Sequence, residues 1–165
     1  MHREVSDRPL TPTLDLVDAE FFGQVRDAVE GFVAVVGPDL RTTSHGRGVK
    51  VWFGDATREH YEAQLVRVGD RELLEIGFHA EHPEAAKNAE VLTRLTAQET
   101  TWRRKLGKEP QAGPFLGRRG WTRVSECWDP PAATLDAAID VAARLADFVI
   151  AIEPRRRVSP RGLEV

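Results

Sequence analysis

Ionisable side chains gather on one side of the segment RELLEIGFHAE, residues 71–81. Residues of a β-strand alternate between two faces, so Glu75, His79 and Glu81 share one face. The opposite face is apolar and consists of Leu74, Ile76, Phe78 and Ala80. Carboxylates and a neutral imidazole on one face can bind a divalent cation or act as an acid–base pair. The segment therefore has the residue types for metal binding or proton transfer.

Spacing limits which of these side chains can share an ion. Along a flat strand Glu75 and His79 lie about 13 Å apart, at about 3.3 Å per residue, which is too far to share an ion directly. His79 and Glu81 lie about 6.6 Å apart. They could share an ion with help from His60 or Glu62, if the preceding strand pairs with this one as a hairpin.

The polar face also has two plainer interpretations. It could be solvated surface, because any exposed strand face alternates in this way, or it could contact another protein. Trp52 would add an aromatic wall beside the polar floor, as in a ligand pocket, a peptide groove or a dimer interface. We therefore treat six residues as one candidate ligand or partner face, with no catalytic residue, metal ligand or cofactor assigned: Trp52, His60, Glu62, Glu75, His79 and Glu81.

The usual catalytic and metal-binding signatures are absent from the sequence. It contains no H-E-x-x-H, C-x-x-C or G-x-S-x-G motif, and no lysine follows Glu75 two residues later, as it does in restriction-type nucleases. Cys127 is the single cysteine, so no intrachain disulfide is possible. We predict that Cys127 lies in or near the core, as do Trp102 and Trp128.

Apolar periodicity and breaker residues define the elements that must position this face. Helical spacing of apolar residues predicts helices over residues 18–36, 83–106 and 135–152. Alternation predicts strands over 49–53, 60–68 and 71–80, the last two joined by a tight turn at Gly69-Asp70, and one or two strands within 115–128. Residues 39–48 and 108–114 are expected to be loops, and Glu153-Pro154 is expected to end the last helix. The predicted core is Phe21, Val25, Phe32, Val51, Leu65, Ile76, Phe78, Leu95, Leu145 and Val149.

The expected fold is α+β, with an antiparallel sheet of four to five strands and three helices on one of its faces, in the order α-β-β-β-α-β-β-α. One domain over residues 18–153 follows an N-terminal arm, 1–17, and precedes a basic C-terminal tail, 154–165. Over residues 18–152 this order resembles the type III secretion chaperone-like α+β architecture, and the chain also resembles uncharacterised bacterial conserved proteins. The resemblance implies a small bacterial protein that dimerises and holds another protein.

Composition narrows the partners. The chain of 165 residues has a net charge of −3, and its acidic body argues against a dedicated duplex-DNA binder. Contact with nucleic acid is expected only through the tail residues Arg155, Arg156 and Arg157. The sequence shows neither a secretory signal nor a membrane span, so we expect a cytoplasmic protein.

Two main functions remain open at this stage, besides the lesser option of a nucleic-acid-associated accessory protein that uses the tail residues Arg155–Arg157. The first is a non-enzymatic, protein-binding domain of the chaperone or adaptor kind, acting through its sheet face as a homodimer. The alternative is a small-ligand-binding protein or a metal-assisted enzyme, with a pocket around Glu75, His79 and Glu81.

Overall fold

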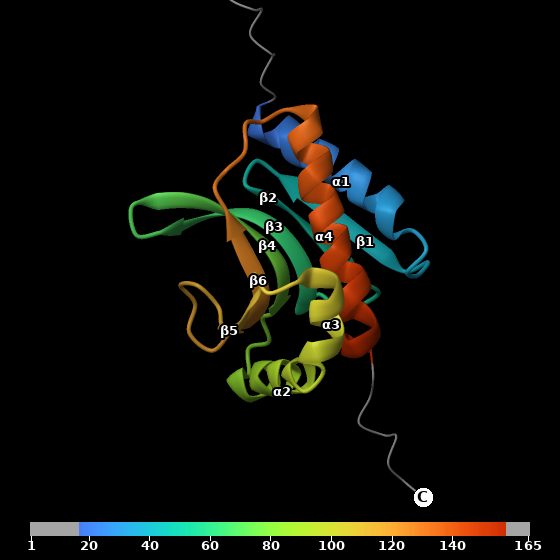
Figure 1. The fold of residues 1–165 in the computed structure, drawn as a ribbon, viewed down its shortest axis with the longest axis vertical. Coiled ribbons are helices and arrows are strands. Elements are labelled where there is room, and N and C mark those ends of the chain that lie inside the picture. Colours follow the sequence, from blue (N-terminus) through green and yellow to red (C-terminus); the bar gives the residue numbers. More distant parts are fainter. Residues whose placement is uncertain (1–16, 158–165) are drawn as a thin grey trace, which may run out of the picture.

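The computed structural model describes residues 17–157 and shows a six-stranded antiparallel sheet with four helices (Figure 1). The elements follow the chain in the order α1 (Asp18–Val33), β1 (Leu40–His45), β2 (Gly48–Phe53), β3 (Glu59–Val68), β4 (Arg71–Ala80), α2 (Ala85–Thr96), α3 (Glu99–Leu106), β5 (Gln111–Pro114), β6 (Thr122–Trp128) and α4 (Leu135–Arg156). The α+β class and the antiparallel sheet are confirmed. The sheet has more strands, and the fold one more helix, than the sequence predicts.

The strand order is β1-β2-β3-β4-β6-β5, so chain neighbours pair except where β6 inserts between β4 and β5. Strands β3 and β4 form the longest ladder, from Glu59 opposite Ala80 to Val68 opposite Arg71. Gly69 has a positive φ of 61° in the tight turn that joins them, as the sequence predicts. This hairpin lies in the middle of the sheet, with β2 on one side and β6 on the other.

The two loops predicted at 39–48 and 108–114 each contain a strand, so those predictions are wrong. Strand β1 pairs with β2 from Leu40 opposite Phe53 to His45 opposite Gly48. Its polar side chains hide the strand signal, and helix α1 provides their partners: Thr42 donates to Glu30, and Arg26 donates to Ser44. Strand β5 pairs only with β6, at the other edge of the sheet.

The helices differ from the prediction at their ends. Helix α1 ends at Val33, and the expected helix 83–106 is two helices, α2 and α3, separated at Ala97 and Gln98. The Nε1 of Trp102 donates to the carbonyl of Leu95 across this break, 2.9 Å away. Helix α4 continues through Pro154 to Arg156. A proline lacks a backbone N–H, yet the helix continues past Pro154, and the amide of Arg157 donates to the carbonyl of Glu153. The prediction that Glu153-Pro154 ends the last helix is therefore wrong.

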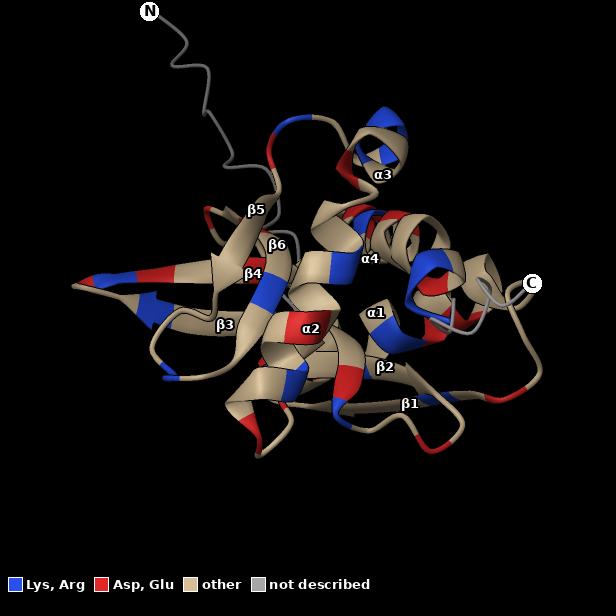
Figure 2. Ribbon diagram, turned by 90° about the horizontal axis from the view of Figure 1, so that it is seen from below, with Lys and Arg blue, Asp and Glu red and all other residues tan. Residues whose placement is uncertain are grey.

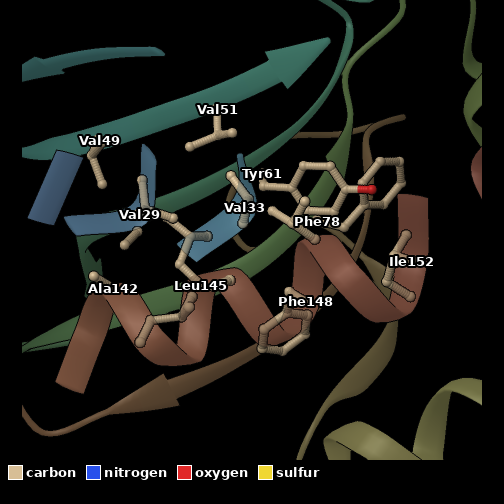
Figure 3. Packing of buried hydrophobic residues seen from close by; sticks show 14 of the residues in the cluster. Val29, Val33, Val49, Val51, Tyr61, Phe78, Ala142, Leu145, Phe148 and Ile152 are labelled. Carbon is tan, nitrogen blue, oxygen red and sulfur yellow. The ribbon is translucent and has the colours of Figure 1, made fainter. Parts of the chain in front are cut away.

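The core lies between helices α1 and α4 and one face of the sheet (Figures 1 and 3). Val49 and Val51 of β2, with Tyr61 of β3 and Phe78 of β4, point toward Leu145 and Phe148 of α4. Eight of the ten predicted core residues are buried, including Ile76, which confirms the faces of β4. Leu65 is half-buried, and Phe32, 44% exposed, lies at the edge of the apolar stripe of α1.

Three further predictions concern single residues. Trp102 is fully buried, as expected, and Trp128 is half-buried against the core. Cys127 is exposed, which corrects the expectation of a core position. Its neighbours Glu126 and Trp128 point to the helix side of β6, so the alternation of the strand turns Cys127 to the other face.

A group of buried hydrogen bonds connects the end of α4 to the sheet. The Tyr61 hydroxyl donates to Oε2 of Glu153 at 2.7 Å, and the guanidinium groups of Arg156 and Arg157 donate to the same carboxylate. These bonds keep the pKa of Glu153 below its usual value although burial alone would raise it. Arg156 and Arg157 are thus engaged with Glu153, and Arg155 donates to the carbonyl of Ala151 within α4. Residues 158–165 of the predicted basic tail and residues 1–16 of the predicted arm lie outside the described residues. Within residues 17–157, no helix is long and apolar enough to cross a membrane.

Candidate functional site

The candidate site lies on the sheet face opposite α1 and α4, where β3 and β4 bring two imidazoles together. His60 and His79 are directly opposite each other in the antiparallel ladder, and their rings stand 5.6 Å apart and nearly perpendicular. Each is followed two residues later by a glutamate on the same face, Glu62 and Glu81. Because the strands run in opposite directions, the two glutamates extend to opposite sides of the histidine pair.

Four side-chain atoms from these residues converge, and we call them the inner cluster. Oε2 of Glu62 lies 3.2 Å from Nε2 of His60 and 3.2 Å from Nδ1 of His79. Oε1 of Glu81 lies 3.5 Å and 3.6 Å from the same two nitrogens. All four residues offer a ligand atom within 4.8 Å of the others. Two nitrogen and two oxygen donors of this kind form a ligand set for a divalent transition metal.

A second layer of contacts orients both imidazoles. Nδ1 of His60, the nitrogen that faces away from the cluster, lies 3.0 Å from the carbonyl oxygen of Thr57. Nε2 of His79, which also faces away, lies 2.7 Å from Oε1 of Glu75, although the angle falls outside that of a well-aligned hydrogen bond. Each outer nitrogen thus has an oxygen acceptor nearby, which favours the tautomer protonated at that nitrogen. In this tautomer the inner nitrogen has a lone pair that points into the cluster.

Glu75 is itself held by neighbours on both sides. The Nε2 of Gln64 donates to its Oε1 at 3.2 Å, and the Ser125 hydroxyl donates to its Oε2 at 3.1 Å. Arg123 donates in turn to the Ser125 hydroxyl at 2.7 Å. The carboxylate beside His79 therefore has a fixed position, although it is completely buried.

Gly77 makes room for this arrangement between β4 and β6. It stands opposite Glu62 in the β3–β4 ladder and opposite Ser125 in the β4–β6 ladder. A Cβ atom at this position would lie 2.4 Å from the carbonyl oxygen of Val124 and 2.5 Å from the Cα of Ser125. The close approach of the two backbones requires glycine here. It also leaves no side chain between Glu75 and His79, which contact each other at 2.7 Å on the polar face.

The inner cluster is shut off from solvent on its histidine side. The side chains of His60 and His79 are 0% exposed, while those of Glu62 and Glu81 keep 8% and 13%. The ring of Phe115 stands edge-on to His79, with centroids 4.8 Å apart, and Trp121 packs on Phe115. The polar face is therefore a buried centre, and its interpretation as solvated surface is wrong.

Burial and hydrogen bonding act against each other on the ionisable groups. Burial alone would raise the pKa of Glu62, but hydrogen bonds with His60 and His79 lower it to about 2. The pKa values of Glu75 and Glu81 are also lowered, against burial, by their contacts with histidine. Burial would lower the pKa of His79, yet its contacts with the carboxylates of Glu62, Glu75 and Glu81 raise it well above its usual value. Without a metal ion, the cluster therefore holds its carboxylates charged and favours a proton on His79.

The structure brings together the five ionisable residues of the face predicted from sequence. His60, Glu62, His79 and Glu81 form the inner cluster, and Glu75 supports it from outside, as the spacing along the strand requires. Trp52 lies on the same face, because its neighbour Lys50 pairs with Glu62, and is half-buried. Sequence reasoning missed the supporting residues Gln64, Ser125 and Phe115, since two of them lie on elements distant in the chain.

One sequence signal does mark the centre. The pattern His-x-Glu stands at 60–62 and at 79–81, at the outer ends of the two predicted strands on either side of the Gly69-Asp70 turn. In a hairpin centred on this turn, position 60 pairs with position 79, so the two motifs must meet. Comparison of the chain with protein-family models, with curated proteins and with solved structures finds no match. The resemblance to secretion chaperones therefore stays a prediction.

Proposed function

We propose that this protein binds one divalent transition-metal ion between His60, Glu62, His79 and Glu81. The observation that carries the proposal is the convergence of four ligand atoms, one from each residue. The two imidazoles are already oriented by the Thr57 carbonyl and the Glu75 carboxylate at their outer nitrogens. Neighbouring ligand atoms of a tetrahedral ion bound at about 2.0–2.2 Å lie about 3.3–3.6 Å apart. The four nitrogen–oxygen distances of the cluster, 3.2, 3.2, 3.5 and 3.6 Å, are already close to this range.

Charge balance supports a cation at this position. Glu62 and Glu81 both contact the imidazoles of His60 and His79 in a largely buried space. The low pKa of Glu62 keeps its carboxylate charged near neutral pH. A buried charge needs a paired charge or a metal. A divalent ion would neutralise both carboxylates and would replace the proton that His79 otherwise holds.

The position of the ligands favours a functional ion over a structural one. All four come from β3 and β4, two strands that already pair over ten consecutive residues. A structural ion gains most by joining segments that would otherwise separate, and these strands do not need it. Imidazole with carboxylate suits Zn²⁺, Mn²⁺ or Fe²⁺ better than Mg²⁺ or Ca²⁺. An ion with more than four coordination positions would also leave room for an added ligand, as a metal-assisted enzyme requires.

Metal titration of the chelator-stripped protein tests this proposal. Calorimetry with Zn²⁺ and Mn²⁺, and with Fe²⁺ without oxygen, should show one ion per chain, and elemental analysis of the dialysed complex should agree. His79→Gln should weaken binding by at least about a hundredfold, because it removes an inward nitrogen. The matched control is His82→Gln, since His82 pairs with Glu59 outside the cluster. Absence of any ion bound more tightly than about 10 µM would refute the proposal.

A protein-binding homodimer remains a second candidate, favoured by one observation. Strand β1 is an edge strand, and Trp52 beside it is only half-buried on the helix-free face. Unpaired strand edges and half-buried aromatic residues are common at protein contacts. Light scattering of the wild type and of Trp52→Ala tests this candidate. A monomer at high micromolar concentration would contradict the homodimer, whatever the metal content.

A further inference from the structure

The loop between β5 and β6, residues 115–121, covers the inner cluster with a series of aromatic and guanidinium groups in contact with one another. Phe115 contacts His79, Trp121 lies 5.8 Å from Phe115 between centroids, and the guanidinium of Arg118 stands 4.4 Å above the Trp121 ring. A positive charge on the surface is thus linked through two aromatic rings to a residue of the centre.

This cover is held mainly at its base. The amide of Phe115 donates to the carbonyl of Trp121, and Asn88 donates to the carbonyl of Gly120. No hydrogen bond joins residues 116–119 to a described helix or strand. Gly117 and Gly120 both have a φ of 85°, a conformation that glycine adopts without strain. The loop can therefore move without breaking the sheet.

Basic residues surround the covered centre. Arg118 and Arg119 are exposed, and Figure 2 shows the basic stretch on this loop. The ion pairs among residues 17–157 involve neither of them. Arg123 stands opposite His79 on β6, and Lys50 stands opposite Glu62 on β2. A divalent ion together with two glutamate ligands has a net charge near zero. The attraction for an anion would therefore come from these Arg and Lys side chains.

We infer that the metal-loaded centre takes a small oxyanion, a carboxylate or a phosphate, as an additional ligand beneath the 115–121 loop. The oxyanion enters past Glu62 or Glu81, the two ligands whose side chains keep residual exposure. Arg118 and Arg119 attract it, and displacement of Phe115 makes space beside His79. This inference rests on the proposed metal site.

Visible absorption of the Co²⁺-loaded protein tests the inference, because the d–d bands of Co²⁺ change when a ligand is added. Acetate and inorganic phosphate are titrated separately, which distinguishes the two sources of oxyanion. Arg118→Ala/Arg119→Ala should weaken anion binding roughly threefold to tenfold and leave Co²⁺ affinity unchanged, since exposed charges contribute modestly. The control is Arg104→Ala/Lys108→Ala, which removes two exposed charges elsewhere on the surface.

Each outcome decides a different point. A spectral change with either anion, weakened in the loop variant and not in the control, supports the inference. A bound Co²⁺ whose spectrum responds to neither anion overturns the inference and leaves the metal site intact. An equal response of the loop variant and the control also overturns it, because the loop would then play no part in recognition. Failure to bind Co²⁺ refutes the proposed function itself.

Discussion

Glu75 offers the sharpest test of how the centre is built, because it lies outside the inner cluster and acts on it through one contact. Its Oε1 lies 2.7 Å from Nε2 of His79. Glu75→Gln keeps the size of the side chain and removes its charge. An amide offers one acceptor oxygen, whereas the carboxylate accepts from Gln64 and Ser125 while facing His79. If the amide nitrogen faces His79, the imidazole must turn its proton inward, where a metal would bind.

The magnitude follows from this loss of orientation. Replacing an outer partner of a metal-bound histidine typically weakens metal affinity 10–100-fold, which is about 1.4–2.7 kcal/mol at about 1.4 kcal/mol per decade. The complete burial of Glu75 places the expected effect near the upper end, since no water can replace the carboxylate.

The assay is competition for Zn²⁺ with a chromogenic chelator, with circular dichroism of the metal-free variant to verify folding. Glu72→Gln is the matched control, on the same strand but exposed and paired with Arg47. Wild-type affinity in a folded Glu75→Gln variant would refute the idea that this carboxylate orients His79.

Three further predictions concern stability. The metal-free protein should lose stability as the pH rises from about 6.5 through the folded-state pKa of His79. Contacts with carboxylates raise that pKa although burial alone would lower it. The unfolded chain therefore releases the proton at a lower pH than the folded protein does, and the folded state loses its advantage over this range. Urea unfolding at several pH values checks this, and His79→Gln should flatten the dependence. Ile76→Ala should cost about 2–5 kcal/mol, because it leaves a cavity in a fully buried position; a near-wild-type melting temperature would contradict the packing. Gly77→Ala should cost about 1–3 kcal/mol or more, because its Cβ would meet the Val124 carbonyl at 2.4 Å, and unchanged chemical denaturation would show that β6 can yield.

The sequence predicts the central hairpin well because its signals are local. The alternation of β4 assigns Ile76 to the core and His79 to the polar face, and the Gly69-Asp70 turn sets the register of the ladder. The apolar stripe of α1 and that of α4 likewise follow from helical spacing. The edge strands escape prediction because their residues are polar or few, and their ladder bonds to β2 and β6 stabilise them instead.

The sequence by itself determined which residues share the polar face, since two-residue periodicity depends on the chain alone. Only the tertiary structure decided that this face is buried. Phe115 and Trp121 come from a loop that follows β4 by more than thirty residues, and Ser125 reaches Glu75 only because β6 inserts beside β4. Burial changes the chemistry of the same side chains, because charges that water would solvate must instead find partners in one another or in an ion.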